Sequence, residues 1–212
     1  MPEPHDYPAL LSAIDRWQYG VRERHPGIIP CHPGCSACCY GPFDISVADA
    51  LLLRDTVASL PPAAQHALRK RALNQVTRMG AIDPGFHAPF DTSGLDEDRL
   101  DALVEALADD PCPALDGEGR CLVYTGRPMV CRLMGLGIET ARGDVIENAC
   151  PIQDEFPAYE ALGPQRVDLD LWEDGEALAE AGAAVILFGT PSRSDFETTV
   201  AGAILLGTSQ GN

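Results

Sequence analysis

The sequence predicts a mainly α-helical protein with an irregular cysteine-rich centre and a small β-hairpin, packed by about five or six helices. Apolar residues recur at helical spacing in several stretches, and Pro- and Gly-rich loops with eight cysteines interrupt them. The hydrophobic share, 45% of 212 residues, is enough for one core. We therefore expect one domain over residues 1–212, with a metal-binding core at about 31–150 and flanking helices at 7–24 and 168–206.

The N-terminal half is expected to hold four helices. Residues 7–24 repeat apolar side chains at helical spacing, and Pro26 ends that helix because proline disfavours helix at the residue before it. Ser46 is the expected N-cap of a second helix. Two further helices are predicted at 63–78 and 95–108.

The C-terminal half combines a hairpin with two closing helices. Residues 135–140 and 145–146 flank the tight turn Arg142-Gly-Asp and are predicted to pair. Helices are predicted at 168–188 and 194–206. We find no repeat in the sequence.

The chain is strongly acidic. It carries 32 acidic residues against 14 arginines and a single lysine, Lys70, for a net charge of −17. Such a surface repels nucleic-acid phosphates and anionic lipid, so we expect neither partner, and a basic protein is the electrostatic alternative. The charge is also explained by solubility alone. The N-terminus lacks a secretory pattern, so a cytoplasmic location, where thiols stay reduced, is the expectation.

The first cysteine cluster is Cys31, Cys35, Cys38 and Cys39 in a Pro/Gly-rich loop. Clustered thiolates bind zinc at about 2.3 Å in a tetrahedron, or an iron–sulfur cluster, and the spacing does not separate these two. Adjacent residues of an extended segment point to opposite sides. Cys38 and Cys39 therefore either serve two sites, or one is a ligand and the other is packed.

The second cluster contains Cys112, Cys121 and Cys131, followed by Cys150. The turn sequence Asp116-Gly-Glu-Gly is expected to bring Cys112 and Cys121 back toward each other. All eight cysteines are the predicted metal ligands, as two four-thiol sites or as one site with spare thiols: Cys31, Cys35, Cys38, Cys39, Cys112, Cys121, Cys131 and Cys150.

Two arginines flank Cys131. Arg127 and Arg132 are expected to offset the charge of thiolates and to donate hydrogen bonds to sulfur, although Arg127 could instead pair with Glu118. His32 lies inside the first cluster, where it is either a ligand, a proton relay or a solvent-facing loop residue.

Other readings of the cysteines remain open. In a secreted protein eight cysteines could form four disulfides. Cys35-x2-Cys38 is also a redox-type C-x-x-C, although no thioredoxin-like βαβ pattern surrounds it. The spacing from Cys31 to Cys38 also matches radical S-adenosylmethionine enzymes, but a helix precedes it and few strands follow.

The chain resembles the YkgJ-type family of cysteine-cluster proteins, which is described as a zinc- or iron-chelating domain of the CxxCxxCC type. Cys112-Pro113, Gly119-Arg-Cys121, Val123-Tyr124, Arg127-Pro128 and Cys131-Arg132 carry the downstream motif, and Cys150 matches the last cysteine. The first motif has one inserted residue after Cys31. The resemblance implies metal binding, with zinc or iron left open.

We therefore predict a protein that binds zinc or an iron–sulfur cluster through its cysteines. An iron–sulfur centre is slightly favoured, because thiols are almost the only plausible ligands. The alternative is an iron–sulfur enzyme that modifies a protein side chain, since a flagellin lysine-N-methylase resembles this family. The chain is shorter than expected for that enzyme and lacks a G-x-G cofactor loop after a strand, so whether it is an enzyme stays open.

Overall fold

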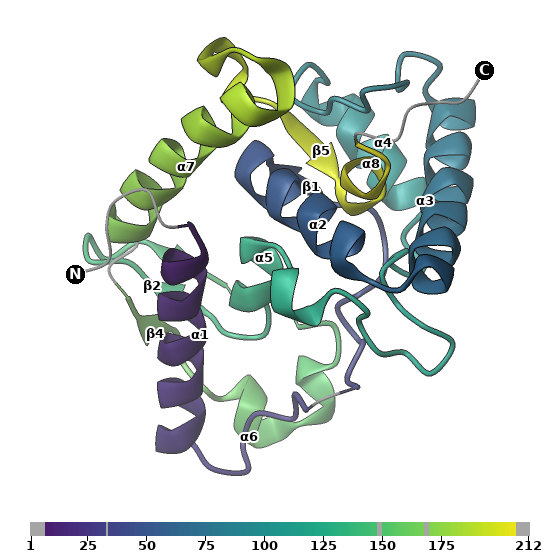
Figure 1. Ribbon diagram of the computed structural model, residues 1–212. Helices are drawn as coiled ribbons and strands as arrows, with labels where there is room; N and C mark the ends of the chain where they lie inside the picture. Colours follow the sequence, from purple (N-terminus) through teal and green to yellow (C-terminus); the bar gives the residue numbers. More distant parts are fainter. Residues whose placement is uncertain (1–6, 33, 148–149, 168–169, 207–212) are drawn as a thin grey trace. The chain divides into compact units, whose positions relative to one another are not determined.

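The computed structural model describes residues 7–32, 34–147, 150–167 and 170–206. The predicted class is confirmed: the described residues form eight α-helices and a few short strands (Figure 1). The chain divides into two compact units, which we call unit 1 (residues 1–38 and 129–179) and unit 2 (residues 39–128 and 180–212). One domain over residues 1–212 stays a prediction.

Unit 1 is built around the first helix. Its elements are α1 (Tyr7–Arg24), α5 (Met129–Leu133), η2 (Gln153–Glu155), α6 (Pro157–Glu160), the first part of α7 (Asp170–Phe188), β2 (Ile138–Glu139), β3 (Val145–Ile146) and β4 (Gln165–Arg166). Helix α1 has the predicted bounds and buries Leu11, Ile14 and Val21 along one face. The ring of Trp17 meets that of Trp172 edge to face, with 5.7 Å between their centroids.

The small sheet of unit 1 contains the predicted hairpin. Strands β2 and β3 pair antiparallel, with Ile138 opposite Ile146. Strand β4 adds a parallel pairing to β2, which the sequence does not predict because β4 is only two residues long. The chain also folds back at Tyr159, whose buried hydroxyl donates a hydrogen bond to the Gly135 carbonyl.

Unit 2 holds the larger apolar core. Its elements are β1 (Asp44–Ser46), α2 (Val47–Ser59), α3 (Pro62–Ile82), α4 (Glu97–Ala106), η1 (Tyr124–Gly126), the end of α7, η3 (Pro191–Arg193), β5 (Glu197–Thr199) and α8 (Val200–Leu205). Helix α8 packs against both α2 and α3 (Figure 1). Leu53, Leu68, Met79, Leu103 and Ile204 are fully buried in this core.

The helix predicted over residues 194–206 is wrong in its first half. Residues 197–199 form strand β5, which pairs antiparallel with β1, and α8 begins only at Val200. The β-branched pair Thr198-Thr199 suits a strand, and β1 supplies its hydrogen-bond partners. Thr199 then caps α8, because its side chain accepts a hydrogen bond from the Gly202 amide at 3.1 Å.

The two paired strand–helix segments of unit 2 have similar short sequences, while the expectation of no repeat stays a prediction. Residues 43–52 (FDISVADALL) and 196–205 (FETTVAGAIL) share their Phe, Val, two Ala and final Leu. Both segments run from a strand into a helix with a Ser or Thr cap. Ile45 pairs with Thr198 at the middle of both strands, so the two segments lie antiparallel to each other there.

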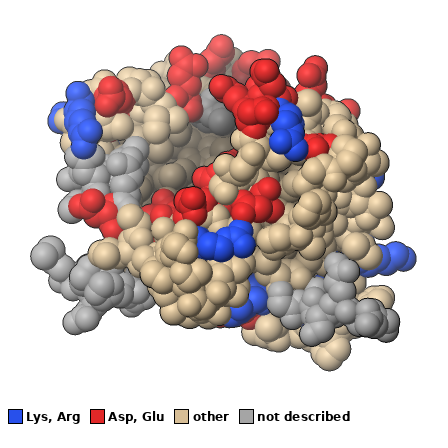
Figure 2. Space-filling model, turned by 90° about the horizontal axis from the view of Figure 1, so that it is seen from above, with Lys and Arg blue, Asp and Glu red and all other residues tan. Residues whose placement is uncertain are grey.

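The acidic composition is visible at the surface. In the view of Figure 2, Asp and Glu side chains cover more of the molecule than Lys and Arg. Among the described helices, none has both the length and the apolar character needed to cross a bilayer.

Candidate metal centre

The cysteines divide between the two units. All eight lie among the described residues as half-buried thiols. Unit 1 carries Cys31, Cys35, Cys38, Cys131 and Cys150, and unit 2 carries Cys39, Cys112 and Cys121. The boundary falls between Cys38 and Cys39, the adjacent pair whose side chains were expected to point apart.

The first motif in unit 1 is folded by a tight turn. The Cys35 amide donates a hydrogen bond to the His32 carbonyl at 2.9 Å. Gly34 inside this turn has φ of 92°, a left-handed conformation that favours glycine. The His32 side chain is exposed, whereas its carbonyl takes part in the turn.

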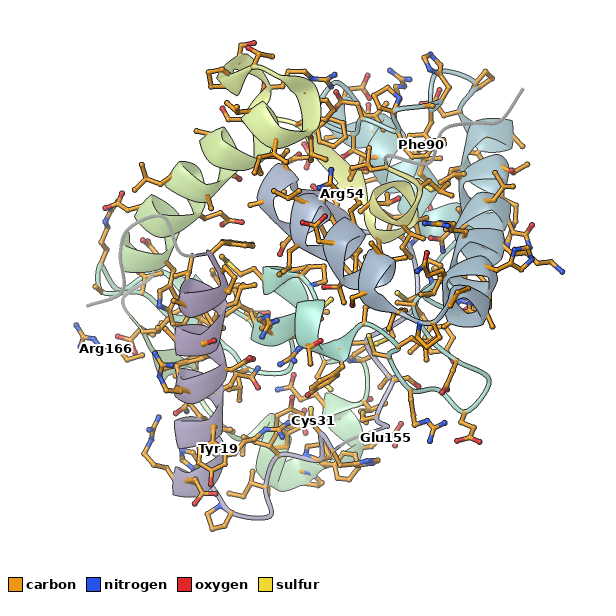
Figure 3. All side chains as sticks on the ribbon, in the orientation of Figure 1. Tyr19, Cys31, Arg54, Phe90, Glu155 and Arg166 are labelled. Carbon is orange, nitrogen blue, oxygen red and sulfur yellow. The ribbon has the colours of Figure 1, made fainter. Side chains whose placement is uncertain are left out.

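Cys31 lies against the loop that follows α5. A Cβ atom added at Gly135 would be 3.3 Å from the Cys31 sulfur and 3.3 Å from the Tyr159 hydroxyl. Gly135 also has φ of 92°, so the close approach and the backbone conformation both require glycine there. Figure 3 shows Cys31 beside α6, the helix that carries Tyr159.

Four thiols of unit 1 share one electrostatic environment. Burial is the main cause that raises the pKa of the Cys31 thiol, and the Arg22 guanidinium opposes it. The charges of Cys150, Cys35 and Cys38 raise the pKa of Cys31 further. Arg22 is a site residue that the sequence analysis missed, although it stands in the last turn of the helix that precedes the motif.

Cys131 lies on α5, next to an internal ion pair. Arg132 is only 4% exposed and pairs with Asp15 of α1. This pair fixes the short helix with Cys131 to the longest helix of unit 1. The predicted contact of Arg132 with thiolates stays a prediction.

Unit 2 brings its three cysteines together through the backbone. The Cys112 amide donates a hydrogen bond to the Cys39 carbonyl at 2.8 Å, and Tyr40 bridges to Pro111. Cys121 bridges to Leu115, whose amide donates to the Cys112 carbonyl at 3.0 Å. The expected return of Cys121 toward Cys112 is therefore seen.

Asp116 organises the turn between Cys112 and Cys121. Its carboxylate accepts hydrogen bonds from the amides of Glu118 at 2.8 Å and Arg120 at 2.9 Å, and it pairs with the Arg120 guanidinium at 3.0 Å. The Arg120 amide is the main cause that holds the pKa of Asp116 below its usual range. Glu118 lies 2.8 Å from Arg120, a partner that the sequence analysis had not considered.

Arg127 lies in the electrostatic neighbourhood of Cys121. Burial is the main cause that raises the pKa of the Cys121 thiol, while the Val123 amide and the Arg127 charge oppose it. The Arg127 guanidinium stacks on the Tyr124 ring, 4.1 Å from its centroid, and donates to the Tyr124 carbonyl at 3.0 Å. A cation is thus held beside one of the predicted ligands.

The donor set suits a thiolate-bound metal, although the sulfurs are not already gathered around one point. Across the described residues, no three Cys, His, Asp or Glu side chains stand ready to hold a metal ion. Thiols are the donors that structural zinc and iron–sulfur clusters use, and each unit presents at least three of them from loops. Metal binding would draw these sulfurs together, as expected when a site forms with its metal.

Comparison with known proteins identifies a family to which the cysteine-bearing part of the chain is similar. Residues 30–151 match the CxxCxxCC family, described as "Putative zinc- or iron-chelating domain". A protein of Vibrio cholerae serotype O1 named "Putative carboxypeptidase" is 30% identical over 93 residues, which are 44% of this chain and 27% of that protein. The matched region thus spans about a quarter of that relative. No solved structure matches the chain.

Proposed function

Because the chain belongs to the CxxCxxCC family of zinc- or iron-chelating domains, we propose that it holds zinc or an iron–sulfur cluster through its clustered cysteines. The match of residues 30–151 to this family supports the proposal most directly, and the charges of three other thiols of unit 1 also act on Cys31. Such a concentration of thiols is costly when they ionise without a cation, and a metal removes that cost.

The proposed ligands of a first centre are Cys31, Cys35, Cys38 and Cys150. Four thiolates complete either a tetrahedral zinc site or a cubane iron–sulfur cluster. Arg22 would offset part of the negative charge that such a centre retains, because it already acts on Cys31.

The proposed ligands of unit 2 are Cys39, Cys112 and Cys121, which the backbone joins. Three thiolates hold a metal and leave a coordination position for a further ligand. Arg127 stands beside Cys121 and offsets charge here. Cys131 and Arg132 remain predicted participants, as a ligand and as a donor to sulfur.

Iron–sulfur is the slightly preferred occupant, because cysteine is almost the only ligand type that these loops present. A structural or metal-handling role in a reducing compartment such as the cytoplasm is the leading proposal. The alternative is an iron–sulfur enzyme acting on a protein side chain, for which the acidic surface would suit a basic protein partner. The activity in the name of the Vibrio cholerae relative is not part of the proposal, because the match covers only 27% of that protein.

Metal analysis tests this proposal. The protein would be purified without oxygen, its metal content measured by mass spectrometry and its visible spectrum recorded. Iron with sulfide and a broad band near ~400 nm is expected for a cysteine-ligated cluster, whereas about one or two zinc ions in a colourless protein would identify zinc sites.

Variants identify the ligands. Cys38→Ser should lower the metal content, and a chelator that strips the metal should reduce the helical circular dichroism if metal supports the fold. Ser36→Ala, in the same loop, is the matched control and should retain the metal. Metal-free wild-type protein, or unchanged metal content and fold in Cys38→Ser, would refute the proposal.

A further inference from the structure

A half-buried arginine outside the cysteine motifs reaches the second cluster. Arg71 lies on α3, three residues after Leu68 and four before Gln75, so it shares the face of the helix that these buried residues occupy. Its Nε donates a hydrogen bond to the Pro113 carbonyl at 2.8 Å. Pro113 directly follows Cys112, so the guanidinium is anchored one residue from a proposed ligand.

One nitrogen of this guanidinium lacks a hydrogen-bond acceptor among the described residues. Within the described residues, the Nη2 atom of Arg71 is buried and has no hydrogen-bond acceptor. Arginine keeps its charge in proteins, and a buried charged donor without an acceptor is costly. A stable fold is therefore expected to supply an acceptor, preferably an anionic one, at this position.

The surroundings point to sulfur as that acceptor. Leu68 and Ala72, which flank Arg71 in the helix, belong to the apolar core of unit 2, and Cys112 packs against the same core. Arg71 binds the chain segment that begins at Cys112, through the Pro113 carbonyl. A metal-bound thiolate is an anion that accepts N–H hydrogen bonds, and donors of this kind tune metal sites.

We propose that Arg71 is a positioning residue for the unit 2 centre, and that its Nη2 donates to the Cys112 thiolate when that thiolate binds metal. This inference rests on the proposed function. It adds a second guanidinium, on the α3 side, to Arg127, which stands beside Cys121. Three thiolates with two arginines would make a centre of low net charge within an apolar surrounding.

A double-mutant cycle with cobalt tests the proposal. The reduced, metal-stripped full chain would be titrated anaerobically with Co²⁺ against a competing chelator, as wild type, Arg71→Met, Cys112→Ser and the double variant. Cys112→Ser should weaken one cobalt site, and Arg71→Met should lower the affinity of that same site by about tenfold, the usual effect of removing an outer-shell partner. In the Cys112→Ser background the same change should have little further effect, because the donor would have lost its acceptor.

The matched control is Arg69→Met. Arg69 is on the same helix and also has a buried side-chain nitrogen without an acceptor in the described part of the chain, so its loss reports the general cost of changing such an arginine. It should leave cobalt affinity unchanged. Arg71→Lys keeps the charge without the planar fork and should give an intermediate affinity. If Arg71→Met does not fold by circular dichroism, Arg71→Gln takes its place in the cycle.

The outcomes separate the two proposals. Wild-type protein that takes up no cobalt contradicts the proposed function itself. Wild-type protein that binds cobalt, with equal affinity in Arg71→Met, overturns only the role of Arg71. The same holds if Arg69→Met weakens binding equally, or if the losses in Arg71→Met and Cys112→Ser are additive, since Arg71 would then serve another acceptor.

Discussion

At Gly126 the segment that follows Cys121 packs against helix α2, and the Gly126→Ala variant tests how close this packing is. Gly126 is buried at the end of η1, between Cys121 and Arg127. A Cβ atom added there would lie 2.0 Å from the Oγ1 of Thr56 on α2, 2.8 Å from its Cβ and 3.0 Å from its Cγ2. The Thr56 hydroxyl donates to the Leu52 carbonyl at 2.8 Å, so this side chain is held in place.

The overlap sets the size of the effect. Normal contacts between carbon and neighbouring heavy atoms begin at about 3.5 Å, so a methyl group at Gly126 must displace η1 from α2 or turn the Thr56 side chain. Overpacking of this kind costs about 1–3 kcal/mol, and loss of the Thr56 hydrogen bond adds about 1 kcal/mol. We expect Gly126→Ala to lower the unfolding free energy by about 3 kcal/mol, from the sum of these two effects.

Thermal unfolding followed by circular dichroism measures this change. For a chain of this length, 3 kcal/mol corresponds to a fall in the midpoint of roughly 6–12 °C. Gly94→Ala is the matched control, because nothing lies within 4 Å of its added Cβ. Thr56→Ala should partly rescue Gly126→Ala by removing two of the three clashing atoms. A midpoint for Gly126→Ala equal to that of Gly94→Ala would refute the packing argument.

Two predictions concern pH. Because burial and neighbouring thiolates raise the pKa of Cys31, the metal-free native protein holds this proton more tightly than the unfolded chain, and its stability should fall as pH rises from the ordinary thiol range through the raised pKa. Urea unfolding at increasing pH should show a flatter dependence in Cys31→Ser, and an unchanged slope would contradict the assignment. Because the Arg120 amide lowers the pKa of Asp116, the stabilising effect of this carboxylate should be present at neutral pH and disappear as pH falls through the lowered pKa. Asp116→Asn should already be less stable at neutral pH and should lack that acid-dependent part, and equal acid slopes in both proteins would exclude the role of Asp116.

The sequence predicts best those helices whose ends depend on residues close by in the chain. Helix α1 begins and ends where its apolar spacing and the following Pro26 place it. Helix α3 continues through Gly80 to Ile82, although glycine there favours an earlier stop. A Cβ at Gly80 would lie 3.2 Å from the Phe86 carbonyl, so glycine serves the packing of the next loop and does not end the helix.

Strand β5 could not be predicted from its own residues. Three residues followed by an apolar run suit a longer helix, and only the pairing with distant β1 makes them a strand. The similar sequence at residues 43–52 is no guide, because strand β1 in that segment was not predicted either.

The candidate site also contains some residues that local sequence predicts and others that only distant contacts bring to it. The cysteines and the Asp116 turn follow from spacing and turn chemistry within a few residues. Arg22 and Arg71 could not be assigned, because helices outside the cysteine motifs bring them to the thiol-bearing loops. The two units could not be inferred either, since their boundary separates adjacent Cys38 and Cys39.

The pairing of β1 with β5 joins segments far apart in the sequence, and this affects the order in which unit 2 folds during synthesis. Helix α8 supplies Ala201, Ala203 and Ile204 to the core of unit 2, yet it leaves the ribosome after all the other helices described. Helices α2 and α3 therefore wait for their last packing partner while every cysteine of the unit has already emerged. A nascent chain of this kind depends on long-range contacts that form late, which slows folding and leaves its thiols accessible to metal before the core closes.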